Sequence, residues 1–361
     1  MVYLAEPEHL GDLLPNEPRY RTDQLTEWLY RHPVLDASAM TNLPASVRES
    51  ISSDLWPFEL VIDQVGDGGE TRKWLFRCHD GSQIETVLMG YSSRTTLCIS
   101  SQVGCAMGCT FCATGQFGFD RHLSAGEIVA QVAYANAYLA ATPLPRSPER
   151  VTNVVFMGMG EPLANYTHTR ESIRRMIEIM GMSARSITVS TVGFVPGMRR
   201  LIEEPWPMNL AVSLHSTIPS ERTKLVPINK RYPIDDVVEA AHDYYKAKGR
   251  RVSLEWTLIA GENDSDEEAI GLARIAREIH AHVNVIALNP TPLSTDRPPD
   301  RDHVRRFLAT LAREGANVTL RDTRGQDIDA ACGQLRLRNS RTQGMNPPSR
   351  SLSAQRTGEL R

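Results

Sequence analysis

Short apolar runs separated by segments of helical periodicity cover most of this 361-residue chain. From residue 95 onward, six runs rich in Val, Ile and Leu are typical of buried β-strands: TLCISSQV, VTNVVFM, SITVST, MNLAVSL, VSLEWTLI and VNVIALN. Helical spacing lies between or after them, at residues 124–139, 166–180, 234–247, 266–280 and 302–314. Strands that alternate with helices predict right-handed crossovers and a parallel sheet.

This alternation predicts an α/β fold in which six strand–helix units form a partial (β/α)6 barrel. A doubly wound open sheet is the alternative, because the pattern does not decide whether the sheet closes. In both folds the chemistry lies at the carboxyl ends of the strands. Polar residues that follow the predicted strands are therefore the first candidates for a functional site.

The rest of the chain has other patterns. Residues 1–60 read as short helices joined by proline-containing turns, which predicts a small helical accessory domain. Residues 61–94 contain WLFRC and IETVLM on either side of a turn with Asp-Gly, which predicts a β-hairpin linker. The barrel and a C-terminal segment then occupy residues 95–337, and residues 338–361 are polar, lack periodicity and are expected to be disordered.

Composition narrows the class of protein. Hydrophobic residues make up 41% and charged residues 23% of the chain, enough for a large core. No secretory leader or membrane span is evident, and the six cysteines do not form a secreted disulfide pattern. We therefore expect a cytoplasmic protein with no membrane contact, and a monomer, since no coiled-coil or apolar docking pattern is present.

The net charge of −3 offers no global electrostatic argument for nucleic-acid binding. An RNA-binding surface would have to be a local basic patch. The candidates are Arg199 with Arg200, residues 222–231, and the tail after Leu335. Each of these stretches is more often an ordinary solvated surface, so charge alone does not indicate RNA.

Three cysteines, Cys105, Cys109 and Cys112, lie within eight residues in the run CAMGCTFC. Thiolates at this spacing can converge on one centre, whereas zinc sites and most iron–sulfur clusters take four ligands. A cubane cluster held by three thiolates leaves one iron open to an external ligand, as in radical S-adenosylmethionine (SAM) enzymes. The competing interpretation is a zinc site, completed by one of the remaining cysteines, Cys78, Cys98 and Cys332, or by a histidine.

Polar residues also recur where the predicted strands end. They stand in the runs GMGEPL, STVGF, SLHS and NPTP, as Gly160, Glu161, Ser190, Ser213, His215 and Asn289. Taken singly, each would be a cap or turn residue. Their recurrence after successive strands indicates a rim that binds a cofactor.

The motifs CAMGCTFCATG, GMGEPL, STVGF, SLHS, LVPINKRY and RGQDIDAACGQL, in this order, resemble the RlmN/Cfr family of radical SAM RNA methyltransferases, and most of all its RlmN branch. The resemblance runs from about Arg19 to Leu335. It implies that Cys105, Cys109 and Cys112 hold a 4Fe-4S cluster. It also implies that SAM is contacted by Gly160, Glu161, Ser190, Ser213, Leu214, His215 and Asn289.

Family members methylate carbon 2 of an adenine in the peptidyl-transferase centre of 23S rRNA, and many also modify the adenine 3′ of the anticodon in tRNA. The resemblance thus implies 23S rRNA and tRNA as partners, together with an electron donor of the flavodoxin or ferredoxin type. Cfr-type methylation at carbon 8 shares every catalytic cysteine and is one alternative. A zinc-stapled RNA-binding protein without catalysis is the other.

The resemblance assigns three catalytic residues. Cys332 takes a methyl group from SAM as a thiolate, Cys98 forms a disulfide with it as the product departs, and Glu85 is the proton acceptor. Radical chemistry is needed because carbon 2 of adenine is not nucleophilic. From the residues alone, Cys98 reads as a strand core residue and Glu85 as an ordinary exposed strand carboxylate.

Overall fold

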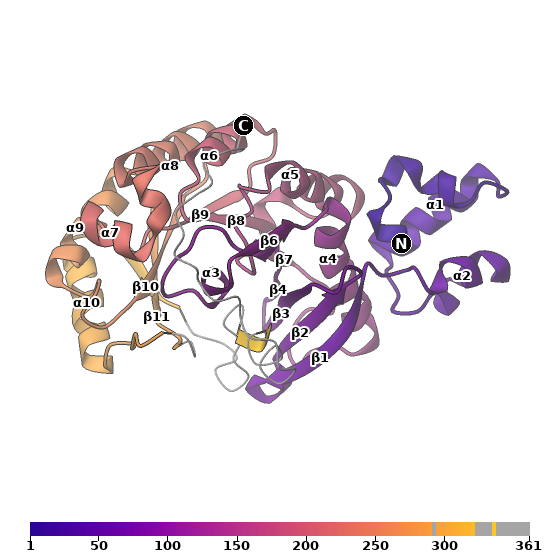
Figure 1. The fold of residues 1–361 in the computed structure, drawn as a ribbon, viewed down its shortest axis with the longest axis horizontal. Coiled ribbons are helices and arrows are strands. Elements are labelled where there is room, and N and C mark those ends of the chain that lie inside the picture. Colours follow the sequence, from indigo (N-terminus) through magenta and orange to yellow (C-terminus); the bar gives the residue numbers. More distant parts are fainter. Residues whose placement is uncertain (291–293, 322–333, 337–361) are drawn as a thin grey trace.

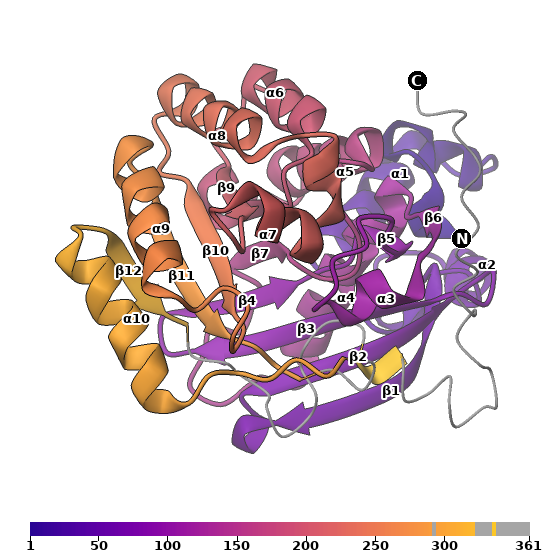
Figure 2. The same ribbon diagram turned by 60° about the vertical axis from the view of Figure 1, so that its left-hand side comes forward.

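The structure, a computed structural model, describes residues 1–290, 294–321 and 334–336. Within these residues, ten strands form one mixed sheet that curves around an interior and carries helices on its outer face (Figures 1 and 2). In spatial order the strands are β1 (Phe58–Gly66), β2 (Thr71–Cys78), β3 (Gln83–Tyr91), β4 (Arg94–Cys98), β7 (Asn153–Phe156), β8 (Ile187–Thr191), β9 (Asn209–Ser213), β10 (Ser253–Leu258), β11 (His282–Ala287) and β12 (Asn317–Leu320).

The six predicted strands are present as β4 and β7 to β11, and each pairs in parallel with the next. The predicted partial barrel is therefore confirmed. β12 adds a further parallel strand beside β11 that the sequence pattern did not predict. Three of its four residues are exposed, so it lacks the apolar run that marks a buried strand.

The five predicted barrel helices are present as α4 (Ala125–Ala141), α5 (Tyr166–Arg174) with the π-helical turn η6 (Arg175–Ile179), α8 (Ile234–Lys248), α9 (Asp266–Glu278) and α10 (Arg301–Arg313). α4 begins with a capping box, in which Ser124 and Glu127 satisfy each other's backbone N–H groups. The structure adds α3 (Ala113–Phe117), α6 (Val195–Glu203) and α7 (Pro219–Leu225). Among the described residues, none of the helices is both long and apolar enough to cross a bilayer.

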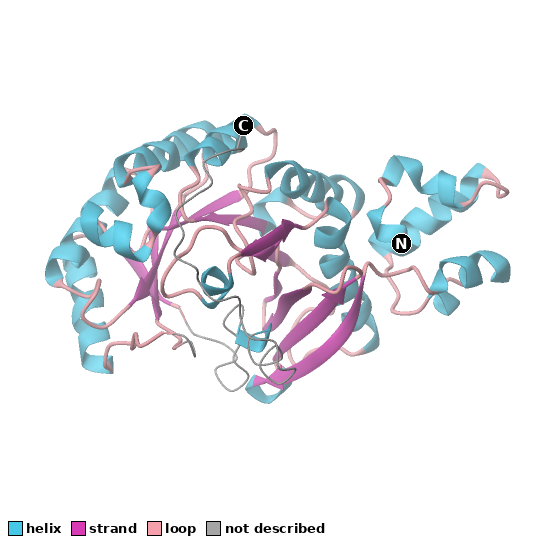
Figure 3. Cartoon of the chain, in the orientation of Figure 1, coloured by secondary structure: helices cyan, strands magenta, loops and turns pink. Residues whose placement is uncertain are grey.

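Short helices before β1 form a unit to one side of the barrel (Figure 3). Tyr3 stacks on Trp56 in its core at a ring distance of 5.0 Å. Arg175 of the barrel, which is buried, pairs with Glu6 and so ties the unit to α5 and η6. The helices are η1 (Val2–Leu4), η2 (Pro7–Leu13), α1 (Arg19–Thr26), η3 (Glu27–Arg31), η4 (Ala37–Ala39) and α2 (Ala45–Ser52).

The predicted hairpin is present as β2 and β3, but it belongs to the main sheet. β1 pairs with β2, and β3 pairs with β4, so three antiparallel strands extend the parallel barrel. Val87 of β3 lies opposite Cys98 of β4. Since residues along a strand alternate between faces, Glu85, Val87 and Met89 all point to the face that Cys98 shares.

Candidate active site

The cysteine motif occupies the loop between the strands of a small second sheet, β5 (Gln102–Gly104) and β6 (Phe119–His122). Gly104 has a φ of +76°, and a Cβ there would lie 2.1 Å from the carbonyl oxygen of Gly118. Only glycine permits this close approach. The N–H of Cys105 donates to the same carbonyl at 2.7 Å. The base of the loop is thereby closed, and α3 follows it directly.

All three thiols of the loop line one cavity of about 370 Å³. Burial raises the pKa of Cys105 to about 12 and that of Cys109 well above its usual value, and the charge of Cys112 raises both further. Three thiolates here need positive charge beside them, which iron supplies. Within the described ranges, no three His, Cys, Asp or Glu side chains meet closely enough for a single metal ion. Three thiols on one loop that line one cavity are a donor set that fits a cubane cluster.

The strand ends supply much of the remaining wall of the cavity. Gly160, after β7, has a φ of +103°, and a Cβ there would lie 2.5 Å from the Cβ of Gln102. Leu214 is completely buried in the hydrophobic core and does not line the cavity. The other six residues predicted to contact SAM do line it: Gly160, Glu161, Ser190, Ser213, His215 and Asn289.

Glu161 presents a buried carboxylate at this rim. Its two oxygens accept the backbone N–H groups of Leu163 at 3.1 Å and Val192 at 2.9 Å. Burial raises the pKa of Glu161 to about 7, and these hydrogen bonds oppose the rise. In the described part of the chain, no Lys, Arg or His forms an ion pair with it. A carboxylate held this way suits a ligand with an ammonium group.

His215 connects the end of β9 to the cysteine loop. Its ring packs edge-on against Phe111 at 4.6 Å, and its Nδ1 accepts the N–H of Thr257 at 3.0 Å. Burial and the charge of Arg222 lower the pKa of His215 to about 3. The ring is therefore neutral, with its proton on Nε2.

The residues predicted to act on the substrate lie on the antiparallel strands and β4. Cys98 is buried, lines the cavity and packs with Val87 and Met89. Glu85 is only 1% exposed, so the expectation of an exposed carboxylate is wrong. Its Oε2 lies 2.9 Å from the Nζ of Lys73 on β2, which is itself completely buried. Burial of a charged strand residue is tolerated here because an opposite charge lies beside it.

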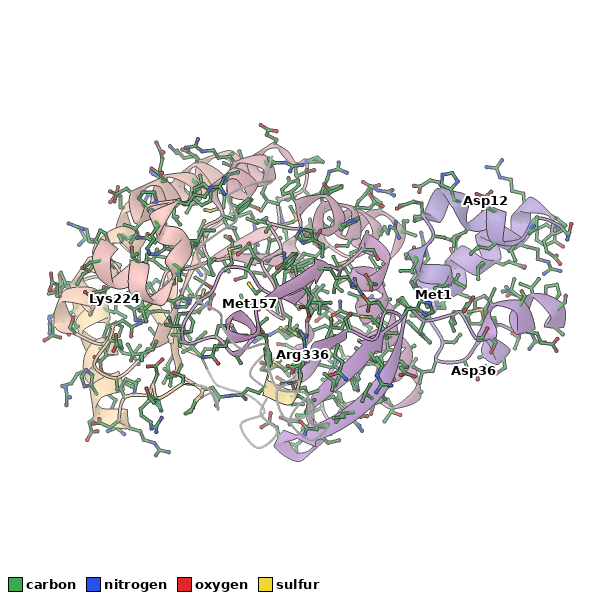
Figure 4. The ribbon with its side chains drawn as sticks, viewed as in Figure 1. Met1, Asp12, Asp36, Met157, Lys224 and Arg336 are labelled. Carbon is green, nitrogen blue, oxygen red and sulfur yellow. The ribbon has the colours of Figure 1, made fainter. Side chains whose placement is uncertain are left out.

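Cys332 lies outside the described residues. The short helical segment 334–336 that follows it is anchored near the cavity, and Figure 4 places Arg336 in the central part of the molecule. The side-chain amide of Gln334 donates to the carbonyl of Pro290 at 2.8 Å, next to Asn289. The backbone N–H of Arg336 donates to Oε1 of Glu85 at 2.7 Å.

Two buried charged residues, Lys73 and Glu255, were missed from the sequence, and a third, Arg222, was misread. Lys73 pairs with Glu85, as described. Glu255 interrupts the apolar run VSLEWTLI, and such a charge inside a predicted core strand was the available signal. One of its oxygens accepts from Asn284 at 2.9 Å, and the other is buried without a hydrogen bond. Arg222, expected in a basic surface patch, is completely buried, which corrects that expectation.

Known proteins with similar sequences agree with this arrangement. Residues 99–273 match the Radical SAM superfamily, and residues 13–55 match the ribosomal RNA large subunit methyltransferase N-terminal domain. The chain is 47% identical over 349 residues to a probable dual-specificity RNA methyltransferase RlmN of Bifidobacterium adolescentis, covering 91% of this chain and 90% of the relative. It is 47% identical over 329 residues to a protein of the same description from Salinispora tropica, covering 88% and 87%.

A solved structure of a related protein has the same fold. The crystal structure of a radical SAM methyltransferase from Sphaerobacter thermophilus superposes with a TM-score of 0.85 at 46% identity. The superposition covers 92% of this chain and 98% of that one. With the cysteine loop, the strand-end rim and these relatives in agreement, the chain belongs to the RlmN family of radical SAM RNA methyltransferases.

Proposed function

We propose that this protein methylates carbon 2 of an adenine in 23S rRNA, and the adenine 3′ of the anticodon in tRNA, through a methylated cysteine. The observation that carries the proposal is a single cavity lined by three cluster cysteines, six candidate SAM contacts and Cys98. Two RNA substrates are supported by the relatives, which are described as dual-specificity enzymes.

In this proposal Cys105, Cys109 and Cys112 hold a 4Fe-4S cluster, and the rim that includes Glu161 holds SAM. When bound, the cluster and SAM supply the radical chemistry that a non-nucleophilic carbon requires. Glu161 offers its carboxylate to the ammonium group of SAM, and neutral His215 keeps the end of β9 against the cysteine loop. A donor of the flavodoxin or ferredoxin type delivers the electron.

The remaining steps belong to side chains of the protein. Cys332, as a thiolate, would take the methyl group of SAM: the new carbon–sulfur bond forms as the methyl–sulfonium bond breaks, and S-adenosylhomocysteine leaves. Gln334, two residues later, is anchored beside Asn289, which supports a thiol close to the rim. After the methyl carbon has joined adenine, Cys98 attacks the sulfur of Cys332. The carbon–sulfur bond breaks, its electron pair stays with the carbon, and that carbon takes up a proton to become the methyl group. The disulfide that remains between Cys98 and Cys332 is reduced by an external thiol.

Glu85 accepts the proton that leaves carbon 2. The ammonium group of Lys73 balances its charge in the buried site. The contact between Glu85 and the Arg336 backbone N–H supports this role, because it brings the proton acceptor to the segment that follows Cys332. A flipped-out adenine is the form of substrate that reaches such a site.

Nucleoside mass spectrometry after anaerobic reconstitution tests the proposal. We expect 2-methyladenosine in 23S rRNA fragments and in tRNA, and none with the matched Cys332→Ala variant at equal iron content. Formation of 8-methyladenosine would instead establish Cfr-type regiochemistry. Retention of zinc without SAM cleavage would establish a zinc-stapled RNA-binding protein.

Peptide mass spectrometry separates the steps. A methyl group on Cys332 before RNA is added, and its loss once RNA and reductant are supplied, is the expected result. An unmodified Cys332 in an enzyme that nevertheless methylates RNA would contradict the cysteine route.

A further inference from the structure

Arg222 is a completely buried cation that has only neutral partners. It lies on α7, and its guanidinium donates to the carbonyls of Leu214 at 3.0 Å and Val192 at 2.7 Å, and to the side-chain oxygen of Asn229 at 2.7 Å. Within residues 1–290, 294–321 and 334–336, no Asp or Glu forms an ion pair with it. A buried charge without an opposite charge is strongly destabilising, so a negative partner from outside the protein is expected.

The charge of Arg222 is buried next to the cysteine loop. The N–H of Thr110, in the loop, donates to the carbonyl of Leu225 at the end of α7 at 3.1 Å. Leu225 and Val226 pack in one apolar cluster with Cys109. Val192, whose carbonyl accepts from Arg222 at 2.7 Å, packs in the same cluster and lines the cavity together with Cys109. The guanidinium therefore lies directly behind the wall of the cavity that the three thiols line.

We propose that Arg222 is the buried counter-charge of the iron–sulfur cluster, a positioning residue that favours the reduced state and holds two strand ends at the SAM rim. The inference rests on the proposed function, since it requires the cluster. A cluster held by thiolates becomes more negative by one charge on reduction, and nearby charge is one of the factors that set its potential. A fixed cation beside it makes that reduction easier.

The same arginine orders the rim. Its bonds to the carbonyls of Val192 and Leu214 join the chain after β8 to the chain after β9. Ser190 and Ser213, two candidate SAM contacts, lie just before these carbonyls. If Arg222 only held these carbonyls, its replacement would lower the stability of the fold and leave the cluster potential unchanged.

Redox titration followed by electron paramagnetic resonance distinguishes the two roles. The proteins are full-length wild type, Arg222→Met and Arg222→Lys, reconstituted anaerobically to equal iron content. For Arg222→Met we expect the reduction equilibrium constant to fall about tenfold, a midpoint potential about 59 mV more negative. Arg222→Lys keeps the charge and should shift by less than half as much. Arg305→Met, which removes an exposed arginine on α10, is the control and should not shift the potential.

Asn229→Asp provides an independent variant in case Arg222→Met does not fold. It leaves Arg222 in place and puts a carboxylate where the guanidinium already has a partner. This neutralises the cation, so the potential should again become more negative. A wild-type potential in iron-loaded Asn229→Asp and Arg222→Met would overturn this inference alone. A wild-type protein that takes up no iron would overturn the proposed function and this inference with it.

Discussion

Two buried carboxylates near the cavity are stabilised in different ways. Glu161, on the rim after β7, is held by the backbone N–H groups of Leu163 and Val192, and no ion pair to it is present in the described part of the chain. Glu85, on β3, is paired with the buried ammonium group of Lys73. A buried charge without an opposite charge is costly. The rim carboxylate is therefore suited to a cationic ligand, whereas the charge of Glu85 is balanced inside the protein.

The rim at the strand ends therefore differs from the antiparallel strands β2 and β3. The rim is a ligand-binding region, whereas the strands carry an ion pair that is complete without a ligand. On the rim, glycines and backbone hydrogen bonds shape the cysteine loop and the turn at Gly160. The negative charge of Glu161 is left to be balanced by a bound ligand. On the antiparallel strands, the pairing of β2 with β3 places Lys73 diagonally across from Glu85, and the two side chains form an ion pair. Loss of a ligand should therefore affect the rim and leave the ion pair of Lys73 and Glu85 intact. Variants in each region can test this difference.

The largest effect is expected when one of the three proposed cluster ligands is removed. Cys109→Ser should abolish stable iron binding and reduce RNA methylation by more than about a thousandfold, which corresponds to about 4 kcal/mol of activation free energy. Iron analysis and nucleoside mass spectrometry measure both quantities. Cys78→Ala, at a buried cysteine in the core, is the control and should keep its iron. Four irons in Cys109→Ser would show that another residue completes the site.

Breaking the ion pair of Lys73 and Glu85 should lower the stability of the fold, whether or not the cluster is bound. Lys73→Met leaves Glu85 without its ammonium partner, so the free energy of unfolding should fall by about 3 kcal/mol. Urea unfolding of the apoprotein measures it. The double variant Lys73→Met/Glu85→Leu should recover most of the loss, because it removes the uncompensated charge. Equal stabilities of Lys73→Met and wild type would contradict the assignment of a buried ion pair.

A smaller effect is expected when only the rim carboxylate is neutralised. Glu161→Gln keeps the size of the side chain but removes the negative charge that is proposed to meet the ammonium group of SAM. SAM affinity of the iron-loaded protein should fall about tenfold, or about 1.4 kcal/mol. Equilibrium dialysis measures the affinity, and urea unfolding should show little change, in contrast to Lys73→Met. Unchanged SAM affinity would remove Glu161 from the cofactor site.

The smallest effect concerns Glu255, which has one oxygen without a hydrogen bond. Burial raises its pKa, so its favourable contribution to folding is present when it is protonated and is lost as pH rises above the usual carboxyl range. Glu255→Gln should therefore be more stable than wild type at pH 8, by about 1 kcal/mol, and gain less at pH 5. Thermal unfolding at the two pH values tests it. The same gain at both would show that the carboxylate does not titrate in this range.

Most of the barrel and of the rim was predictable from the sequence. Buried parallel strands appear as apolar runs, and the residues after them meet at one edge, which is why Gly160, Ser190 and Asn289 line a common cavity. The apolar pattern did not reveal β12, whose residues are mostly exposed. The side chain of Leu214 packs into the core, although its neighbours line the cavity. A motif indicates that a segment is near the site, but the direction of each side chain depends on the backbone.

The charged residues Lys73, Arg222 and Glu85 were misread or missed for a common reason. In the sequence they resemble ordinary surface charges, since local spacing carries no information about a partner on another element. Burial of Arg222 follows from the packing of α7 on the cysteine loop, and burial of Glu85 follows from its pairing with Lys73 across two strands. Neither packing contact is encoded as a local pattern.

The sequence by itself determined the alternation of strands and helices, the compact cysteine motif and the polar groups that follow the strands, because each depends on residues close together in the chain. The tertiary structure alone decided which charges are buried, which of them are paired inside the protein and which side chains share the cavity. Those properties depend on desolvation and on contacts between distant elements, so they exist only after the sheet has curved and the helices have packed against it.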